Sequence, residues 1–216
     1  ANSGLLMPPF SLLSVDADPE RAAGEATYPC VLKPLMLSAS RGVIRADNPD
    51  EFITAFHRIT RILKQPDVVT MGDAAKHILV EGYIAGREVA LEGLLGGGRL
   101  TVLALFDKPD PLDGPFFEET IYVTPSRLPE SLQSRVVDAT VQAVAALGLR
   151  DGPIHAELRL NDQGPWLIEL GARSIGGLCA RVLRFGAGIS LEELILSHVL
   201  GLPNETMARE DKAAGV

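Results

Sequence analysis

The most regular alternation of hydrophobic and polar positions in this chain lies in residues 152–177. A period of two is typical of β-strands, and turn-forming residues interrupt the alternation at 161–164. The pattern therefore predicts two strands joined by a tight loop. If residues 162–164 form the loop, each step back along the first strand is matched by one step forward along the second strand. Glu157 is then expected opposite Glu169.

These two predicted strands divide their side chains between two faces, because side chains alternate along a strand. One face carries the charged and polar set: His155, Glu157, Arg159, Glu169, Gly171 and Arg173. The other face is apolar: Ile154, Ala156, Leu158, Leu160, Trp166, Ile168, Leu170 and Ala172. We expect this apolar face, Trp166 included, to pack in a core.

Two carboxylates directly across a ladder repel one another and destabilise the pair. A cation between Glu157 and Glu169 would relieve the repulsion, and hard oxygen ligands suit Mg²⁺. The alternative is a solvated hairpin face with charges of both signs. We favour the metal because the like charges align while the opposite face is apolar. A shift of one residue in the register would move one carboxylate to the other face, so the interpretation depends on the loop length.

Hydrophobic patterns elsewhere predict the other elements. Strands are expected at residues 28–34, 43–44, 78–80, 87–95 and 99–106, the last two joined through three consecutive glycines. Helices are expected at residues 18–23, 48–63, 130–147, 177–185 and 190–201. Residues 1–24 otherwise show little periodicity and are interpreted as a lead-in. Residues 108–119 form a long proline-rich loop of the kind that often carries binding residues.

This order of elements predicts an α+β protein in two lobes, with a mostly antiparallel sheet in the second lobe. We expect a smaller lobe at residues 1–84, a larger lobe at 85–202 and a truncated tail at 203–216. Both ends resemble cuts, which predicts that the 216 residues belong to a longer protein lacking its N-terminal and extreme C-terminal domains here.

The composition is that of an ordinary globular protein, with 46% hydrophobic and 22% charged residues. The net charge of −8 argues against a nucleic acid or an anionic membrane as a partner. Cys30 and Cys179 lie in apolar segments without metal-ligand spacing, so we expect buried free thiols. A cytoplasmic location is the resulting prediction.

Several further residues suit nucleotide chemistry. Lys33 at a strand end can supply a point charge to phosphate, and the small-residue turn 38–42 can offer backbone N–H donors. A linker at 81–84 and Glu88 beyond it complete the series. Each feature alone has a simpler explanation: a solvated lysine, an ordinary turn, a solvated strand residue. Their order and spacing carry the information.

That order resembles the ATP-grasp superfamily, most closely the carboxylate–amine ligases typified by bacterial L-amino acid and dipeptide ligases. The resemblance extends from about Tyr28 to Gly201 and implies a nucleotide between two α+β lobes. It implies phosphate contacts for Lys33, and a mobile phosphate-covering loop made of Ser38, Ala39, Ser40, Arg41 and Gly42. It implies adenine contacts for Glu81, Tyr83 and Ile84, ribose contacts for Glu88, and Mg²⁺ at Glu157 and Glu169. Arg173 would stabilise the transferred phosphoryl group.

Some positions depart from the family pattern. The superfamily usually has Asn at the position of Gly171, so one metal ligand is missing and either water replaces it or a second Mg²⁺ binds more weakly. The turn has fewer glycines than in many relatives, and Arg41 is expected to compensate with charge. His155 either faces an acyl phosphate or is a satisfied strand histidine. Glu119 is interpreted as a solvated loop residue, and the remaining histidines as structural or exposed: His57, His77 and His198.

The resemblance implies an ATP-dependent, Mg²⁺-dependent ligase, with Mn²⁺ as an alternative metal. The enzyme would activate a carboxylate as an acyl phosphate for attack by an amine. Small-molecule carboxylates and amines are therefore the expected partners, and a homodimer is left open. Three alternatives remain at this stage: a biotin-carboxylase-like enzyme that phosphorylates bicarbonate, an ATP-binding fragment without catalysis, and a metal-free structural domain.

Overall fold

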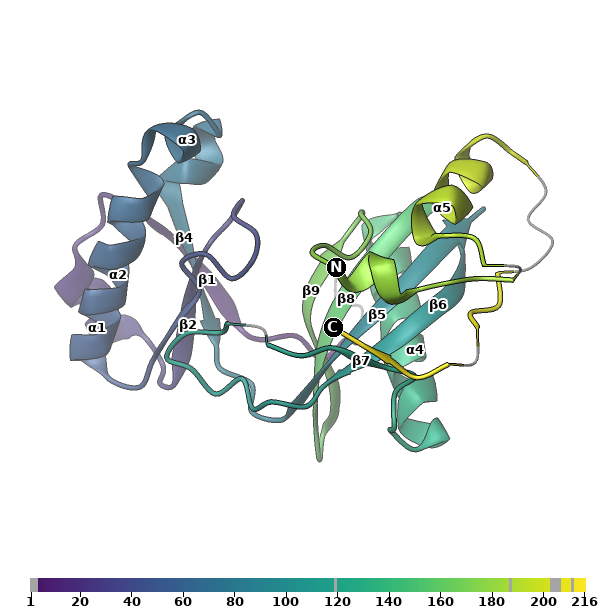
Figure 1. Ribbon diagram of the computed structural model, residues 1–216. Coiled ribbons are helices and arrows are strands. Elements are labelled where there is room, and N and C mark those ends of the chain that lie inside the picture. The colour runs from purple at the N-terminus through teal and green to yellow at the C-terminus, as the bar shows by residue number, and fades with distance from the viewer. Residues whose placement is uncertain (1–3, 119, 187, 203–206, 211) are drawn as a thin grey trace. The chain divides into compact units, whose positions relative to one another are not determined.

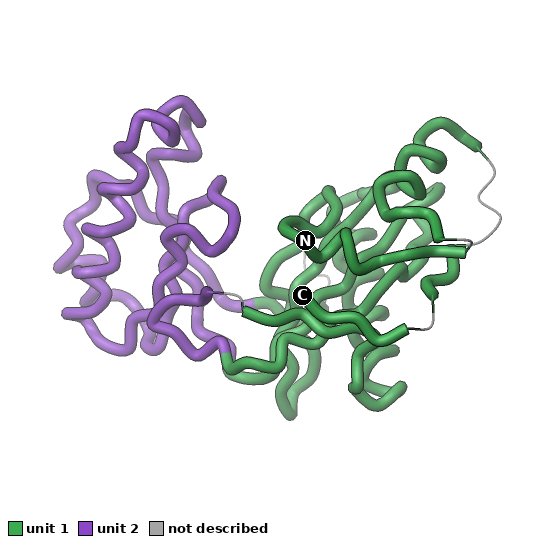
Figure 2. The backbone as a smooth tube through the Cα atoms, viewed as in Figure 1, with its two compact units in different colours: residues 1–7, 85–111, 120–216 green, residues 8–84, 112–119 purple. Residues whose placement is uncertain are grey.

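The computed structural model describes residues 4–118, 120–186, 188–202, 207–210 and 212–216. The chain forms two compact units, each of which contains segments distant in sequence (Figure 2). Unit 1 comprises residues 1–7, 85–111 and 120–216, and unit 2 comprises residues 8–84 and 112–119. Both units combine antiparallel sheets with helices, so the predicted α+β class is confirmed.

Unit 2 is built on a four-stranded antiparallel sheet in the order β1-β4-β2-β3 (Figure 1). Its strands are β1 (Phe10–Ser14), β2 (Cys30–Pro34), β3 (Ile44–Ala46) and β4 (His77–Gly82). Its helices are α1 (Pro19–Glu25), α2 (Pro49–Leu63), the short α3 (Pro66–Val69) and the 3₁₀ helix η1 (Gly72–Lys76). Residues 112–116 join this unit at its β3 edge, where the Arg45 amide donates to the Pro115 carbonyl at 2.9 Å.

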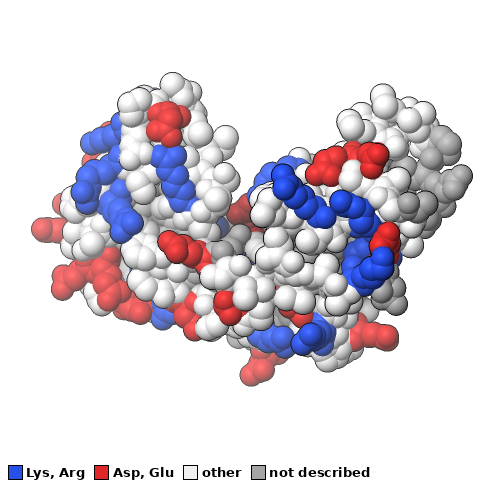
Figure 3. Space-filling view, viewed as in Figure 1, with Lys and Arg blue, Asp and Glu red and all other residues white. Residues whose placement is uncertain are grey.

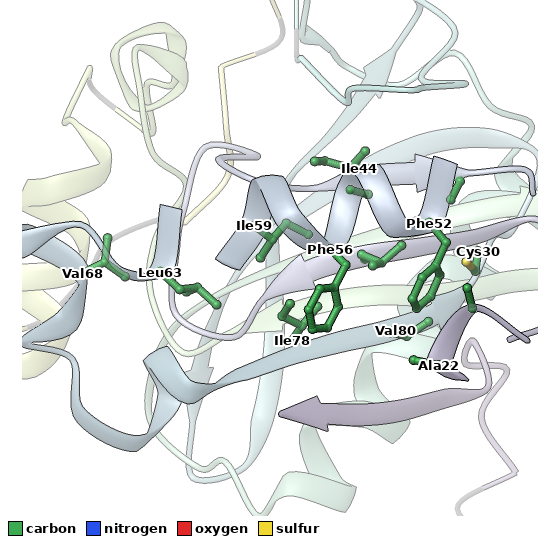
Figure 4. Packing of buried hydrophobic residues seen from close by; sticks show 14 residues of the cluster. Ala22, Cys30, Ile44, Phe52, Phe56, Ile59, Leu63, Val68, Ile78 and Val80 are labelled. Atoms are coloured by element: carbon green, nitrogen blue, oxygen red, sulfur yellow. The ribbon is translucent and has the colours of Figure 1, made fainter. Parts of the chain in front are cut away.

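The core of unit 2 lies between α2 and the sheet. Phe52, Phe56 and Ile59 lie on one side of α2 and point toward Ile78 and Val80 of β4 (Figure 4). The helix starts where the sequence predicts, because the Asn48 side chain accepts a hydrogen bond from the amide of residue 51 at 3.0 Å and Pro49 occupies the first helical position.

Strand β1 was not expected, since residues 1–24 were interpreted as a lead-in. It pairs with β4 at the edge of the sheet, yet Phe10 and Leu12 are 67% and 52% exposed. A strand held by backbone pairing with little side-chain burial leaves no hydrophobic period of two in the sequence. The interpretation of this segment as a lead-in was therefore wrong.

Unit 1 contains a six-stranded antiparallel sheet in the order β10-β7-β6-β5-β8-β9. The strands are β5 (Arg87–Gly96), β6 (Arg99–Lys108), β7 (Val123–Thr124), β8 (Gly152–Asn161), β9 (Gly164–Gly171) and β10 (Ala214–Gly215). Helix α4 (Glu130–Leu147) packs on the face that carries Val89 and Leu91. The 3₁₀ helix η2 (Cys179–Val182) and α5 (Leu191–Val199) pack with the apolar residues of the opposite face, Ala90 and Phe106 among them.

Most predicted elements of unit 1 are confirmed, including the capping box of Ser190 with Glu193 and the left-handed Gly148 that ends α4. The helix expected at residues 177–185 is wrong, because only the four residues of η2 are helical there. Gly177 just before it has φ +62°, a left-handed conformation that interrupts an α-helix.

The hairpin of β8 and β9 places Glu157 opposite Glu169, as predicted, but by a different route. Asn161 pairs with Gly164, so the loop is one residue shorter than expected. A β-bulge between Leu167 and Glu169 inserts one extra residue into β9, so the pairing of Glu169 and the residues after it matches the predicted register. Residues 164–167 consequently lie on the faces opposite to those predicted: Leu167 is buried, whereas Trp166 is only half-buried.

Acidic and basic side chains are interspersed over the visible face of each unit (Figure 3). Across the residues that the structure describes, no helix combines the length and apolar character needed to cross a membrane. Cys30 and Cys179 are both buried and free, as the sequence predicted.

Candidate active site

The charged face of the unit 1 sheet is a row of alternating charges along β5, β6 and β8. We call these six residues the buried charge row: Glu92, His155, Glu157, Lys108, Glu88 and Arg159. Strand alternation places Glu88 and Glu92 on one face of β5, and the sheet register sets them across from Arg159 and His155 of β8. The row therefore follows from the pairing of the β5–β6 hairpin with β8, which comes much later in the sequence.

Short contacts link the centre of the row. Lys108 Nζ lies 2.7 Å from Glu88 Oε1 and 2.8 Å from Glu157 Oε1. Arg159 Nε donates to Glu88 Oε2 at 2.9 Å. The Lys108, Glu88 and Arg159 side chains are only 3%, 9% and 5% exposed. Each charge is thus removed from water and compensated by an opposite charge, which is the condition under which ionised groups persist inside a protein.

His155 connects the other end of the row. Its Nε2 lies 3.4 Å from Glu157 Oε1, and its Nδ1 lies 3.4 Å from Glu92 Oε2. Burial opposes the charged imidazolium, but the two flanking carboxylates outweigh burial and raise the His155 pKa to about 9. Burial likewise opposes the charge on Glu157, yet His155 and Lys108 hold the pKa of that carboxyl well below its usual range. The two neighbouring carboxylates therefore favour the protonated form of His155.

The second predicted metal ligand lies at the exposed end of the same face. The Glu169 side chain is 51% exposed, and its Oε1 lies 3.3 Å from Arg173 Nη2. Gly171 stands between them on β9, and a Cβ there would lie 3.2 Å from Arg173 Cγ and 3.3 Å from its Nε. The absence of a side chain at this position therefore gives the Arg173 side chain its space beside the strand.

The predicted metal pair is compatible with Mg²⁺ but incomplete by itself. Among the described residues, no three His, Cys, Asp or Glu side chains converge on one point in a way that would hold a metal. Glu157 uses Oε1 for both Lys108 and His155, while its Oε2 has no hydrogen-bond or ion-pair partner within the described part of the chain. Mg²⁺ commonly binds one or two carboxylates together with several waters and substrate phosphates, so waters and phosphate oxygens would have to complete the coordination by these two carboxylates.

The predicted phosphate residues lie in unit 2. Lys33 Nζ on β2 forms an ion pair with Glu81 Oε2 at 2.7 Å, with both side chains largely buried. For Lys33 to contact a phosphate, its ammonium must either bind the phosphate and Glu81 together or break the ion pair with Glu81. Glu81 itself lies on β4, directly across the sheet from Val31 of β2.

The turn at 38–42 has a strained backbone and a tethered arginine. Ala39 and Ser40 have φ of 55° and 54°, the left-handed region that non-glycine residues rarely occupy. Arg41 points toward the segment after α2, where its Nη1 lies 2.9 Å from Asp67 Oδ2 and its Nη2 donates to the side chain of Gln65. The sequence suggested that Arg41 supplies charge to a turn with few glycines. In this structure the Arg41 guanidinium is paired with Asp67.

The predicted adenine contacts lie at the end of β4. The Tyr83 hydroxyl donates to Asp113 Oδ1 at 3.1 Å, and its ring stacks with Phe117 at 6.5 Å between centroids. The Arg45 guanidinium lies over the same ring at 4.1 Å. Ile84, the last residue of this stretch of unit 2, is half-buried. Residues 112–117 therefore anchor Tyr83. The sequence did not predict this contact, because the two segments are about 30 residues apart.

A cavity of about 650 Å³ in unit 2 contains none of the predicted site residues. Residues from β3, α2 and the 112–116 segment line it, among them Arg45, Asp50, Arg58 and Phe116. Arg58 lies over the Phe116 ring at 4.6 Å. The residues that line the cavity thus differ from the predicted site residues, and the ionisable side chains are the stronger indication of chemistry.

Lys108 and Glu92 are the site residues that sequence reasoning missed. Lys108 was assigned to the start of a loop, although it ends β6 and is 6% exposed. Glu92 follows Glu88 by four positions on β5, so continued alternation along the strand would have placed both carboxylates on one face.

The remaining predictions concern single residues. Glu119 lies outside the described residues. His57 is exposed, and His77 and His198 are half-buried, as expected for residues without a site role. The prediction that Trp166 lies in the core is wrong: it is half-buried, and its indole N–H donates to Asn161 Oδ1 at 3.1 Å. The bulge in β9 is the physical reason for this difference.

Comparison with known proteins places this chain in a family. Residues 26–182 match the family described as "ATP-grasp domain", and the chain belongs to that family. The chain is 28% identical over 190 residues to alanine–anticapsin ligase of Bacillus subtilis (strain 168), which covers 81% of this chain and 39% of that protein. It is 31% identical over 176 residues to carnosine synthase 1 of Homo sapiens, covering 80% of this chain and 21% of that protein.

A solved structure gives the same answer. The crystal structure of L-amino acid ligase from Bacillus licheniformis matches with a TM-score of 0.79 and 32% sequence identity. The match covers 99% of this chain and 51% of that one. The chain thus spans between 21% and 51% of the length of these relatives. The resemblance to the ATP-grasp superfamily and its fold is confirmed.

Proposed function

We propose that this chain is the ATP-binding part of a ligase that joins a carboxylate to an amine, with an acyl phosphate as the intermediate. The observation that carries the proposal is the cross-strand pair Glu157 and Glu169, with His155 and Arg173 on the same charged surface. Membership of the ATP-grasp family supports a nucleotide substrate. The names of the relatives, an L-amino acid ligase among them, favour amino acids as the carboxylate and amine.

The proposed nucleotide contacts follow from the resemblance to the ATP-grasp family. Lys33 and the turn residues Ser38, Ala39, Ser40, Arg41 and Gly42 would contact the phosphates. Glu81, Tyr83 and Ile84 would contact the adenine, and Glu88 the ribose hydroxyls. Three of the charged contacts have partners that must give way: Glu81 for Lys33, Asp67 for Arg41, and both Lys108 and Arg159 for Glu88. Lys108, once released from Glu88, adds a further positive charge beside Glu157.

Glu157 and Glu169 are the proposed Mg²⁺ ligands, with Mn²⁺ as an alternative ion. The fit rests on their opposed positions, on the unpaired Oε2 of Glu157 within the described part of the chain, and on the exposure of Glu169. Bound there, the ion would neutralise charge on the phosphate oxygens. Water or a phosphate oxygen would occupy the position that a side chain at Gly171 supplies elsewhere in the superfamily.

The proposed reaction has two steps. A carboxylate oxygen of the acyl substrate attacks the γ-phosphorus of ATP, the bond from that phosphorus to the bridging oxygen breaks, and ADP leaves. The amine nitrogen then attacks the acyl carbon, inorganic phosphate leaves with the bonding electrons, and the nitrogen loses a proton. Positioning and charge neutralisation supply most of such catalysis, and Arg173 and the His155 cation are the proposed contributors near the transferred group.

The organisation of the protein is part of the same proposal. Residues 1–84 would act as the smaller lobe and 85–202 as the larger lobe, with 203–216 as a C-terminal tail. Two free, buried cysteines favour a reducing compartment such as the cytoplasm. Small-molecule carboxylates and amines would be the partners, with a homodimer left open and neither nucleic acid nor membrane expected.

A screen for ADP release by the intact protein tests the proposal. Amino acids are supplied singly and in pairs with ATP and Mg²⁺, and products are identified by mass spectrometry. We expect ADP release to require both a carboxylate and an amine, and to accompany an amide product. Glu169→Gln should abolish turnover, whereas Glu192→Gln, which changes an exposed glutamate on α5, should not. Dependence on bicarbonate and biotin, or full turnover by Glu169→Gln, would overturn the proposal.

A further inference from the structure

Glu92 is the most completely buried charged residue of unit 1 among those that the structure describes. It is 0% exposed and lies in the interior strand β5, directly across from His155 of β8. Its pairing partner on the other side is Ala104 of β6, and a β-bulge follows immediately at Gly93. The side chain therefore lies where the charged face of the sheet meets the apolar cluster of Ile175 and Cys179.

The two oxygens of Glu92 are used unequally. Oε2 accepts a hydrogen bond from the Ile175 amide at 3.0 Å and lies 3.4 Å from His155 Nδ1. Oε1 is buried and has no hydrogen-bond partner among the described residues. A buried carboxylate oxygen without a partner is unfavourable, whereas a leucine of similar volume would fill this space without losing hydration. The stability of the fold therefore does not explain a carboxylate at this position.

Both contacts of Glu92 lead to residues with proposed roles in the reaction. His155 Nδ1 lies at ion-pair distance from Glu92 without hydrogen-bond geometry, and its Nε2 is hydrogen-bonded to Glu157, so one carboxylate lies beside each ring nitrogen. Ile175 is two residues beyond Arg173, so its amide bond to Glu92 ties the segment that carries the guanidinium to strand β5. One buried side chain thus contacts both His155 on β8 and the segment just after β9 that carries Arg173.

We propose that Glu92 is a positioning residue: its carboxylate orients His155 through Nδ1 and anchors the segment carrying Arg173 through the Ile175 amide. This inference rests on the proposed ligase function. Glu92 touches neither nucleotide nor metal in this scheme and acts only through these two groups. Preorganised supports of this kind matter because a displacement of about 1 Å in a reacting group can lower a rate about a hundredfold.

Two substitutions separate the contacts. Glu92→Gln keeps the shape and an oxygen acceptor for the Ile175 amide but removes the charge that faces His155. Glu92→Leu removes both. Glu193→Gln is the matched control, because the Glu193 carboxylate also accepts a backbone N–H in unit 1, from Ser190 at 2.8 Å, but lies in the capping box of α5.

The first measurement is steady-state ADP release by the intact protein. We expect Glu92→Gln to lower kcat about tenfold or more while the KM for ATP changes less than about twofold, and Glu193→Gln to match the wild type. In a His155→Ala background, Glu92→Gln should lower kcat further by less than about twofold, because the group it orients is gone. An equal loss of kcat in both backgrounds, or no loss in either, would overturn the proposal.

The second measurement needs no turnover and so separates this inference from the proposed function. Hydrogen–deuterium exchange in residues 171–178 should accelerate in Glu92→Leu and remain close to the wild type in Glu92→Gln, while exchange in α4 is unchanged in both. Unaltered exchange in Glu92→Leu would refute the anchoring role. If the wild type shows no ligase turnover in the substrate screen, the proposed function fails, and the exchange result still decides whether Glu92 holds the segment.

Discussion

Lys108→Met should destabilise unit 1 far more than the loss of one surface charge would. The ammonium of Lys108 contacts Glu88 at 2.7 Å and Glu157 at 2.8 Å, and its side chain is only 3% exposed. Methionine has a similar length and would fill the same space. The change therefore tests the charge of the buried charge row and not its packing.

The expected magnitude follows from burial. Removing one partner of a buried ion pair costs about 3–5 kcal/mol, because the remaining charge stays desolvated and uncompensated. Arg159 still contacts Glu88, and His155 still contacts Glu157, so we expect the lower end, about 3 kcal/mol. That is a substantial share of a typical domain stability of about 5–15 kcal/mol.

Trp166 provides the assay, since it is the single tryptophan and lies in β9 of unit 1. Its fluorescence, followed through urea unfolding, should show a midpoint lower by about 1–2 M in Lys108→Met, for a slope of about 2 kcal/mol per M. Lys212→Met is the control, because that lysine is 81% exposed and pairs with Glu210 at 3.2 Å. Its midpoint should move by less than about 0.5 M, since exposed pairs contribute about 0–1 kcal/mol.

A double substitution refines the test. Lys108→Met combined with Glu157→Gln removes one charge of each sign from the buried charge row. The combined loss of stability should be smaller than the sum of the two single losses, because each change leaves less uncompensated charge in the presence of the other. Strict additivity, or a Lys108→Met midpoint no lower than that of the Lys212 control, would refute the electrostatic account of this row.

Three further predictions concern other parts of the molecule. Asp67→Asn releases Arg41 from its 2.9 Å ion pair and should lower the KM for ATP by up to about fivefold, measured by ADP release; an unchanged or higher KM would contradict this. Burial raises the pKa of the Cys30 thiol to about 11, so a thiol reagent at pH 8 should label Cys30 only after urea unfolding, and rapid labelling of the native protein would contradict its burial. The raised His155 pKa of about 9, against an ordinary value of 6.5, implies a stabilising contribution that is complete below about pH 6.5 and lost as the pH rises through 9. His155→Gln should therefore flatten the fall in urea midpoint between pH 7 and 9, and an identical fall in both proteins would exclude this histidine as its source.

Short-range patterns in the sequence were enough to predict the helix starts and the two facing carboxylates. Asn48 before Pro49, and Ser190 before Glu193, specify their helix ends through contacts within a single turn. The alternation around Glu157 likewise records which side chains share a face. Such features are legible because they depend on neighbours a few residues away.

The register of the β8–β9 hairpin was predicted correctly for an incomplete reason. The sequence indicated a loop of three residues, whereas Asn161 pairs with Gly164 and a bulge at Leu167 to Glu169 supplies the missing residue. A loop that is one residue longer and a bulge of one residue shift the strand pairing by the same amount. The alternation along one strand therefore does not distinguish between them. Only the pairing of β9 with β8 decided where the extra residue lies, and it placed Trp166 outside the core.

Tertiary structure alone decided that the charges of unit 1 form a buried row. The pattern of residues around Lys108 suggested a loop, and alternation along β5 could indicate the face of Glu92 but not its partner. The partners of Lys108 and Glu92, which are Glu88 and His155, lie 20 and 63 residues away in the sequence and meet them only when β5 pairs with β6 and β8. The same holds for residues 112–117, which join β3 and Tyr83 in unit 2. Local sequence determines which face a side chain takes, whereas its electrostatic environment depends on which strands become neighbours, and that choice is made by the packing of the whole chain.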